Sequence, residues 1–167
     1  GTRVIAGAPF TETFVERYGT LQRSERARAA RQHGHLLSDA SLPCSSIGRR
    51  LDFTGDIGQG ARLPSQEVRG REELVLGGTR FELISAPGET DDQLYVYMPD
   101  ESVLLVGDNY YEAFPNLYTI RGTLARKAEP WVASLDLIRK MQPDLLIPSH
   151  TLPVEGRDEI LKRITSY

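Results

Sequence analysis

The sequence has 167 residues, a length that fits one domain, and its 40% hydrophobic content is enough for a buried core. The net charge of −3, with no basic stripe or tail, speaks against a protein that binds nucleic acid or an anionic membrane surface. The single cysteine, Cys44, excludes an internal disulfide, and no apolar stretch is long enough to span a bilayer; the compartment stays open.

The N-terminal third predicts a short strand, a helix and an irregular connection. Residues 2–6 form an apolar strand-like run, and Thr11 or Thr13 can cap a helix that continues to about His33. Residues 38–64 are rich in Gly, Ser and Pro and show little periodicity, which indicates a long irregular connection. Because the chain begins without methionine on an apolar segment, we expect upstream sequence in the parent protein.

The middle of the sequence predicts two β-hairpins. Residues 73–76 and 80–85 flank a pair of glycines, Gly77 and Gly78, which is typical of a tight hairpin turn. Residues 93–98 and 103–106 repeat the arrangement with a longer polar turn.

The C-terminal part predicts helices and one more strand. Apolar residues at helical spacing mark a helix across residues 131–141 and a closing amphipathic helix across 160–167. Between them, residues 145–147 predict a strand that leads into His150. Hairpins followed by helices that pack on one face indicate a layered α/β (α+β) sandwich, in a single domain of residues 1–167.

Three residues with metal-binding side chains each follow an apolar run: Glu89, Asp108 and His150. Carboxylate oxygens and an imidazole nitrogen suit zinc or a similar divalent ion. Gly88 and Gly107 precede the two carboxylates and allow tight turns. Each of the three is alone compatible with an ordinary polar turn, but their order and setting favour a metal site.

These motifs together resemble the metallo-β-lactamase superfamily. The resemblance rests on Pro-Gly-Glu-Thr at 87–90, Gly-Asp at 107–108 and Ser-His at 149–150. Glu89 stands where most members of that superfamily have histidine, and this exchange, with the Phe-Pro-Asn-Leu-Tyr-Thr-Ile-Arg-Gly run at 114–122, looks like the alkyl sulfatase branch. The resemblance covers nearly the whole chain.

The resemblance implies a partial αββα sandwich with a binuclear zinc centre. In it, Glu89 and His150 would each bind one ion and Asp108 would bridge the two. The residues that would hold the sulfate group are Asn116, Thr119, Arg121 and Arg126. Guanidinium groups suit sulfate because they donate paired, charge-assisted hydrogen bonds, although an isolated arginine is ordinarily a solvated cation.

The sequence departs from that family in its histidines. The first metal motif of the family, His-x-His-x-Asp-His, is absent from these residues and is expected upstream. His33 and His35 have the His-x-His spacing but lack the acidic residue and the histidine that should follow, so we interpret them as a polar helix end. A partial ligand set should hold metal weakly, and we expect little or no turnover from this chain alone.

The predicted function is therefore metal-dependent hydrolysis of sulfate esters of linear alcohols by the parent protein, with no catalytic side chain assigned. The alternatives are another ester or thioester hydrolase of the same superfamily, or a non-catalytic fragment or binding module. The expected partner is a small sulfate ester. An incomplete sandwich would also expose an apolar sheet face, so we expect a homo-oligomer or a missing N-terminal segment to cover it.

Overall fold

The computed structural model describes most of the chain, namely residues 2–41, 44–45, 48–49, 60–119 and 124–167. The chain divides into two compact units. The first unit comprises Gly1–Thr13, Pro64–Leu117 and Arg126–Tyr167, and the second comprises Phe14–Leu63 and Tyr118–Ala125. The expectation of a single domain stays a prediction.

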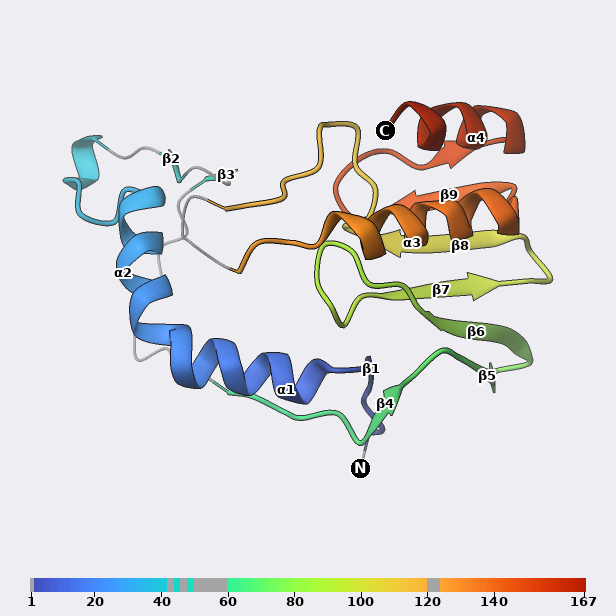
Figure 1. Ribbon diagram of the computed structural model, residues 1–167, viewed down its shortest axis with the longest axis horizontal. Helices are drawn as coiled ribbons and strands as arrows, with labels where there is room; N and C mark the ends of the chain where they lie inside the picture. The colour runs from blue at the N-terminus through green and yellow to red at the C-terminus, as the bar shows by residue number, and fades with distance from the viewer. Residues whose placement is uncertain (1, 42–43, 46–47, 50–59, 120–123) are drawn as a thin grey trace. The chain divides into compact units, whose positions relative to one another are not determined.

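A six-stranded sheet dominates the first unit, with the strand order β10-β9-β8-β7-β6-β5 (Figure 1). Its strands are β5 (Arg71–Leu76), β6 (Thr79–Ser85), β7 (Leu94–Met98), β8 (Val103–Gly107), β9 (Leu145–Pro148) and β10 (Val154–Glu155). All neighbouring strands are antiparallel except β8 and β9, which are parallel. It follows that β6, β8 and β9 run in the same direction and end at the same edge of the sheet.

Both predicted hairpins are confirmed. Gly77 and Gly78 join β5 to β6 with φ angles of 58° and 88°, a left-handed conformation that glycine adopts without strain. The second hairpin joins β7 to β8, and Ser102, the last residue of its turn, has a φ of 56°.

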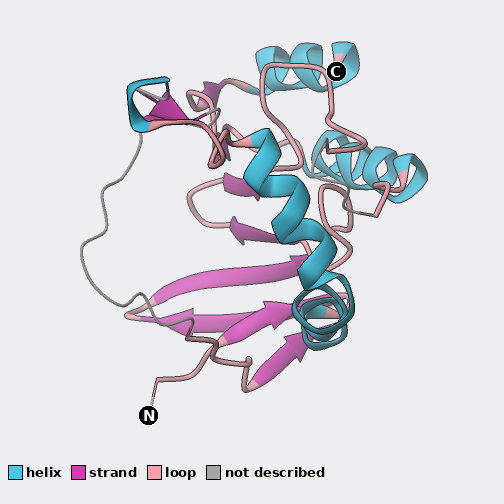
Figure 2. Cartoon of the chain, turned by 90° about the vertical axis from the view of Figure 1, so that its left-hand side faces the viewer, coloured by secondary structure: helices cyan, strands magenta, loops and turns pink. Residues whose placement is uncertain are grey.

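Two helices, α3 (Ala128–Met141) and α4 (Arg157–Ser166), pack on one face of this sheet. On that face, Tyr97, Leu104, Leu146 and Val154 lie side by side on four adjacent strands. Ile138, from α3, is fully buried in the same cluster. Figure 2 shows the sheet from a second direction, with strands in magenta and helices in cyan. The predicted helical layer on a β layer is thus confirmed.

The first unit also holds the beginning of a second β layer. Strand β1 (Ile5–Gly7) pairs in parallel with β4 (Gln66–Val68) in a separate two-stranded sheet. Gly7 lies so close to the segment before β7 that an added Cβ would stand 2.2 Å from the Asp92 carbonyl oxygen and 3.0 Å from Leu94. The two layers agree with the predicted sandwich.

The N-terminal helix begins earlier than the capping argument predicts. It consists of α1 (Phe10–Val15), a π-helical stretch (Glu16–Leu21) and α2 (Gln22–Gln32). Thr11 and Thr13 therefore lie inside the helix, and neither is its cap. Instead, the carboxylate of Glu67 on β4 accepts hydrogen bonds from the Thr11 backbone N–H (2.8 Å) and hydroxyl. The carboxylate of Glu67, from a strand distant in sequence, thus supplies the acceptor that a capping side chain of the helix would provide.

The connection predicted to be irregular contains short regular elements. A 3-10 turn (Asp39–Ser41) precedes a two-stranded hairpin of β2 (Cys44–Ser45) and β3 (Gly48–Arg49). The rest of residues 42–59 lies outside the described part of the chain. Among the helices that the structure describes, none has the length and apolar character needed to cross a membrane.

Candidate functional site

The three predicted metal ligands follow the three strands that share one direction. Glu89 lies in the turn after β6, Asp108 follows β8 directly, and His150 follows β9. Because these strands end at the same sheet edge, the topology brings the three segments to one side of the first unit. In Figure 1, β8 and β9 point toward that edge and β7 points away from it.

Asp108 and His150 face each other across this edge. His150 Nε2 lies 3.4 Å from Asp108 Oδ2, and the two side chains are 66% and 33% exposed, respectively. A backbone hydrogen bond of 3.1 Å from Ser149 to the Gly107 carbonyl ties the two loops together. Gly107 has a φ of 57°, a left-handed conformation that favours glycine, and an added Cβ would stand 2.3 Å from the side-chain nitrogen of Gln93, which would have to move.

Glu89 contacts a residue of the predicted sulfate site. Its carboxylate pairs with the guanidinium of Arg126, and the two side chains are only 17% and 11% exposed. The guanidinium of Arg126 also donates a hydrogen bond to the backbone carbonyl of Asn116. The backbone N–H of Arg126 donates to the Leu117 carbonyl at 2.9 Å. The structure therefore links the predicted metal and sulfate residues through one arginine.

The donor types at this edge fit a divalent cation in part. Asp108 and His150 present an oxygen and a nitrogen to the same space, whereas Glu89 is engaged by Arg126. Within the residues that the structure describes, no group of three or more His, Cys, Asp or Glu side chains is arranged to hold a metal ion. The described part of the chain thus provides a pair of donors, Asp108 and His150, and a third donor, Glu89, whose carboxylate is held in an ion pair.

The remaining predicted sulfate residues are placed differently. The backbone N–H of Asn116 bonds the Tyr111 hydroxyl at 2.8 Å, in the first unit. Thr119 belongs to the second unit and is only 2% exposed. Arg121 lies outside the described residues. Of the four, the structure brings together Asn116 and Arg126.

His33 and His35 lie at the end of α2, in the second unit. His33 is the C-cap residue of that helix, and the two imidazole rings are 5.8 Å apart. This placement agrees with their interpretation as a polar helix end.

Two neighbours of the site are absent from the predicted set. Lys127 pairs with Asp91 at 3.0 Å, beside the pair of Arg126 and Glu89. Asn109, which follows Asp108, is fully buried, and its side-chain oxygen accepts a 2.9 Å hydrogen bond from the Glu89 backbone N–H. Its position directly after the Gly-Asp pair is the sequence signal that could have drawn attention to it.

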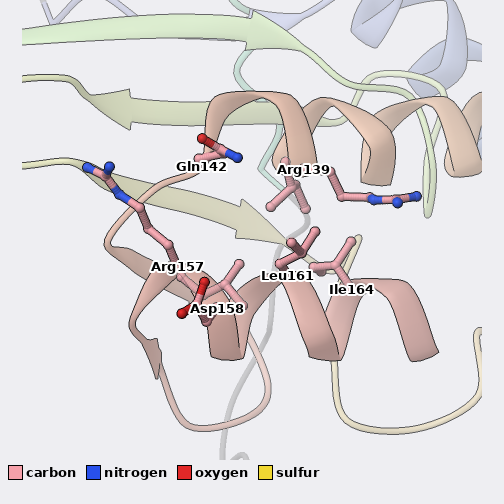
Figure 3. Close-up of a pocket in the computed structure, with 8 residues that line it drawn as sticks. Arg139, Gln142, Arg157, Asp158, Leu161 and Ile164 are labelled. Atoms are coloured by element: carbon pink, nitrogen blue, oxygen red, sulfur yellow. The ribbon is translucent and has the colours of Figure 1, made fainter.

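A separate cavity lies between α3 and α4 (Figure 3). It has a volume of about 190 Å³ and is lined by Ile138, Ile160 and Leu161, with Arg139 and Arg157 among its polar residues. Both arginines form internal ion pairs, Arg139 with an aspartate of its own helix and Arg157 with Asp144. The two arginines of this cavity are thus engaged within the protein, and the candidate site lies at the sheet edge.

The sequence profile of the metallo-beta-lactamase superfamily matches residues 58–150, which is more than half of the chain and includes all three predicted metal ligands. The chain belongs to the metallo-beta-lactamase superfamily. Members of this superfamily generally bind metal ions, often zinc. The resemblance noted from the sequence motifs is confirmed.

Curated relatives come from the alkyl sulfatase branch. The chain is 34% identical over 98 residues to a linear primary-alkylsulfatase of Pseudomonas sp. (strain ATCC 19151), across 58% of this chain and 19% of that protein. It is 31% identical over 99 residues to an alkyl/aryl-sulfatase of Saccharomyces cerevisiae, across 55% of this chain and 15% of that protein. The chain thus spans about a fifth or less of the length of these relatives.

Solved structures support the same fold. A stereoselective inverting sec-alkylsulfatase from Pseudomonas sp. superimposes with a TM-score of 0.79 at 24% identity, covering 98% of this chain and 26% of that one. A metallo-beta-lactamase family protein from Thermus thermophilus gives a TM-score of 0.65 at 19% identity, covering 99% and 51%. At these identities the superpositions establish the layered metallo-beta-lactamase fold of the chain.

Proposed function

We propose that this metallo-beta-lactamase chain is part of a metal-dependent hydrolase that cleaves sulfate esters of linear alcohols. The observation that carries the proposal is that Glu89, Asp108 and His150 follow strands that end at one sheet edge, where Asp108 lies near His150 and Arg126 binds Glu89. The alkylsulfatase relatives at 31–34% identity support the substrate class.

In the proposed centre, which follows the family resemblance, Glu89 and His150 would each help to hold one zinc ion, and Asp108 would be a ligand of both. A bound zinc ion would lower the pKa of its bound water to about 7, which would make hydroxide available at neutral pH. The contribution of this chain is to aim its donors from the ends of β6, β8 and β9, whose hydrogen-bonded strands fix their directions.

The proposed sulfate site consists of Asn116, Thr119, Arg121 and Arg126, which would orient the ester and neutralise its charge. Arg126 supports this role because it already binds a carboxylate, and a guanidinium donates the same charge-assisted hydrogen bonds to the oxygens of a sulfate group. An anion at Arg126 would compete with Glu89 for the same guanidinium. A cation on Glu89 would remove that competition, so zinc should strengthen the binding of a sulfate ester.

The test measures zinc and ester binding by the purified chain. Zinc content is determined by elemental analysis after equilibrium dialysis, and the binding of hexyl sulfate is measured by calorimetry with and without zinc. We expect bound zinc that is lost in a Glu89→Ala, Asp108→Ala double variant, and tighter hexyl sulfate binding in the presence of zinc. Sulfate release from hexyl sulfate, followed by ion chromatography, is expected to be slow or absent because the chain lacks the histidine motif of the family.

Two controls, one ligand and one variant, accompany the test of the proposal. Hexanol controls for the alkyl chain, and Lys127→Met controls for the loss of a neighbouring cation that is not in the proposed site. Zinc binding that survives the double variant would remove the metal centre from this edge. Equal binding of hexyl sulfate and hexanol would remove the sulfate ester as substrate.

A non-catalytic binding role is the second candidate, and the pairing of Glu89 with Arg126 favours it because that carboxylate is already neutralised. Hexyl sulfate binding that is the same with and without zinc would support this role. Zinc-dependent turnover would exclude it.

A further inference from the structure

We propose that Asn109 is a positioning residue that holds the turn carrying Glu89 against the loop carrying Asp108. The inference rests on the proposed function, because it concerns the aim of two proposed ligands. Asn109 is adjacent to Asp108 in sequence and is fully buried. No ion, substrate or charge needs to contact it for this role.

The side-chain amide of Asn109 uses its oxygen and its nitrogen in opposite ways. The oxygen accepts the Glu89 backbone N–H at 2.9 Å, and the nitrogen donates to the Ala86 carbonyl at 2.8 Å and to the Tyr95 hydroxyl at 3.2 Å. An amide offers one acceptor and two donors, so this arrangement matches the group and fixes its orientation. A carboxylate at this position could not donate to Ala86, and an aliphatic side chain would leave both backbone groups unpaired.

The side-chain amide of Asn109 lies against the backbone of Gly88. A Cβ atom on Gly88 would stand 2.3 Å from the Asn109 side-chain oxygen and 2.7 Å from its Cγ, far inside contact distance. The absence of a side chain at Gly88 therefore lets the amide of Asn109 enter the turn. The close contact between Gly88 and Asn109 therefore joins the turn before β7 to the loop after β8.

The other side of Asn109 is anchored to α3. The Trp131 indole donates to the Asn109 backbone carbonyl at 2.8 Å, and the Tyr95 hydroxyl donates to the Ser134 carbonyl at 3.1 Å. The Ser134 hydroxyl in turn donates to the Pro87 carbonyl at 2.7 Å. Ser134 thus bonds the beginning of the same turn, two residues before Glu89, and its loss serves as the comparison for removing one hydrogen bond to the turn that does not involve Glu89.

The experiment titrates the chain with Co²⁺ and records the visible absorption, whose intensity reports the coordination geometry. The variants are Asn109→Leu, which replaces the amide by an apolar group with the same branching, Gly88→Ala, which displaces the amide, and Ser134→Ala as the comparison. Loss of a group that orients a metal ligand typically costs 10- to 100-fold in metal affinity. We expect a loss of about that size, with an altered spectrum, for Asn109→Leu and Gly88→Ala, and a clearly smaller loss for Ser134→Ala, which removes one hydrogen bond to Pro87 and none to Glu89.

Equal Co²⁺ affinity and spectrum in wild type, Asn109→Leu and Gly88→Ala would overturn the inference. If Asn109→Leu does not fold, as judged by circular dichroism, the folded Gly88→Ala variant decides by the same criterion. If the wild-type chain binds no Co²⁺, the proposed metal site fails, and amide hydrogen exchange in the metal-free chain decides the positioning role separately. Faster exchange of the Glu89 amide in Asn109→Leu than in Ser134→Ala would support it, and equal exchange would refute it.

Discussion

At the scale of single residues, the pair of Glu89 and Arg126 differs from its neighbours in its shielding from water. Its side chains are 17% and 11% exposed, whereas the adjacent pair of Asp91 and Lys127 is 50% and 66% exposed. Exposed ion pairs are screened by solvent and contribute little, while removing one partner from a shielded pair leaves an uncompensated charge. The two pairs join the same two segments, so they form an internal comparison.

A double-mutant cycle tests this difference. The free energy of unfolding in metal-free buffer is measured for Glu89→Gln, Arg126→Met and the double variant, and the same is done for Asp91→Asn with Lys127→Met. We expect a coupling energy of about 1 to 3 kcal/mol for the first pair and below about 1 kcal/mol for the second. A coupling energy near zero for the first pair would show that Glu89 is not held by Arg126 in solution, and equal couplings would show that the difference in shielding has no effect.

At the scale of elements, α4 begins with a cation at a position that favours anions. Arg157 is the first residue of the helix, where the positive end of the helix dipole opposes its charge. Asp144, just before β9, offsets this because its carboxylate accepts two hydrogen bonds from the Arg157 guanidinium, at 2.7 and 3.1 Å. These bonds, with one involving Ser102, lower the pKa of the Asp144 carboxyl below its usual value.

The lowered pKa predicts a pH dependence. The carboxylate is favoured in the folded state, so its contribution is fully present above the unfolded pKa of about 4 and is lost as the pH falls through the lower folded pKa. Asp144→Asn should therefore unfold more easily than wild type at pH 7, and the difference should shrink toward pH 2. Urea unfolding at both pH values measures it, with Asp136→Asn, in an exposed pair on α3, as control. A difference that is the same at both pH values would contradict the assignment.

At the scale of the whole molecule, the two faces of the six-stranded sheet differ in how deeply their side chains are buried. The face toward α3 and α4 carries fully buried Leu104 and Leu146. On the opposite face, Val96, Leu105 and Ile147 lie in one cross-strand row and are only partly buried. The expected homo-oligomer or N-terminal partner, which would cover such a face, stays a prediction that sedimentation velocity can test.

The helical face should carry most of the stability of the first unit. Leu146→Ala removes a fully buried side chain from the middle of that face, and we expect a loss of about 2 to 5 kcal/mol in the free energy of unfolding. Val132→Ala, on α3 but 57% exposed, should change it by no more than about 0.5 kcal/mol. Chemical denaturation measures both, and similar losses would mean that the layer is not packed as described.

The local elements were predictable because their signals are local. The paired glycines at 77 and 78, the alternation in the hairpin strands and the helical spacing across 131–141 each act over a few residues, and each predicted element is present. The predicted start of the N-terminal helix was wrong. The acceptor for the Thr11 backbone N–H is the carboxylate of Glu67 on β4, which is distant in sequence, and not a nearby capping side chain.

The sequence by itself determined the family, the layered fold and the candidate donors, because these follow from short motifs in a fixed order. Only the tertiary structure decided which candidates meet: Asp108 faces His150, Arg126 holds Glu89, and buried Asn109 ties two of these loops together. The physical reason is that such contacts depend on strand direction, register and the burial of polar groups between distant segments. These are properties of the folded chain that no local pattern encodes.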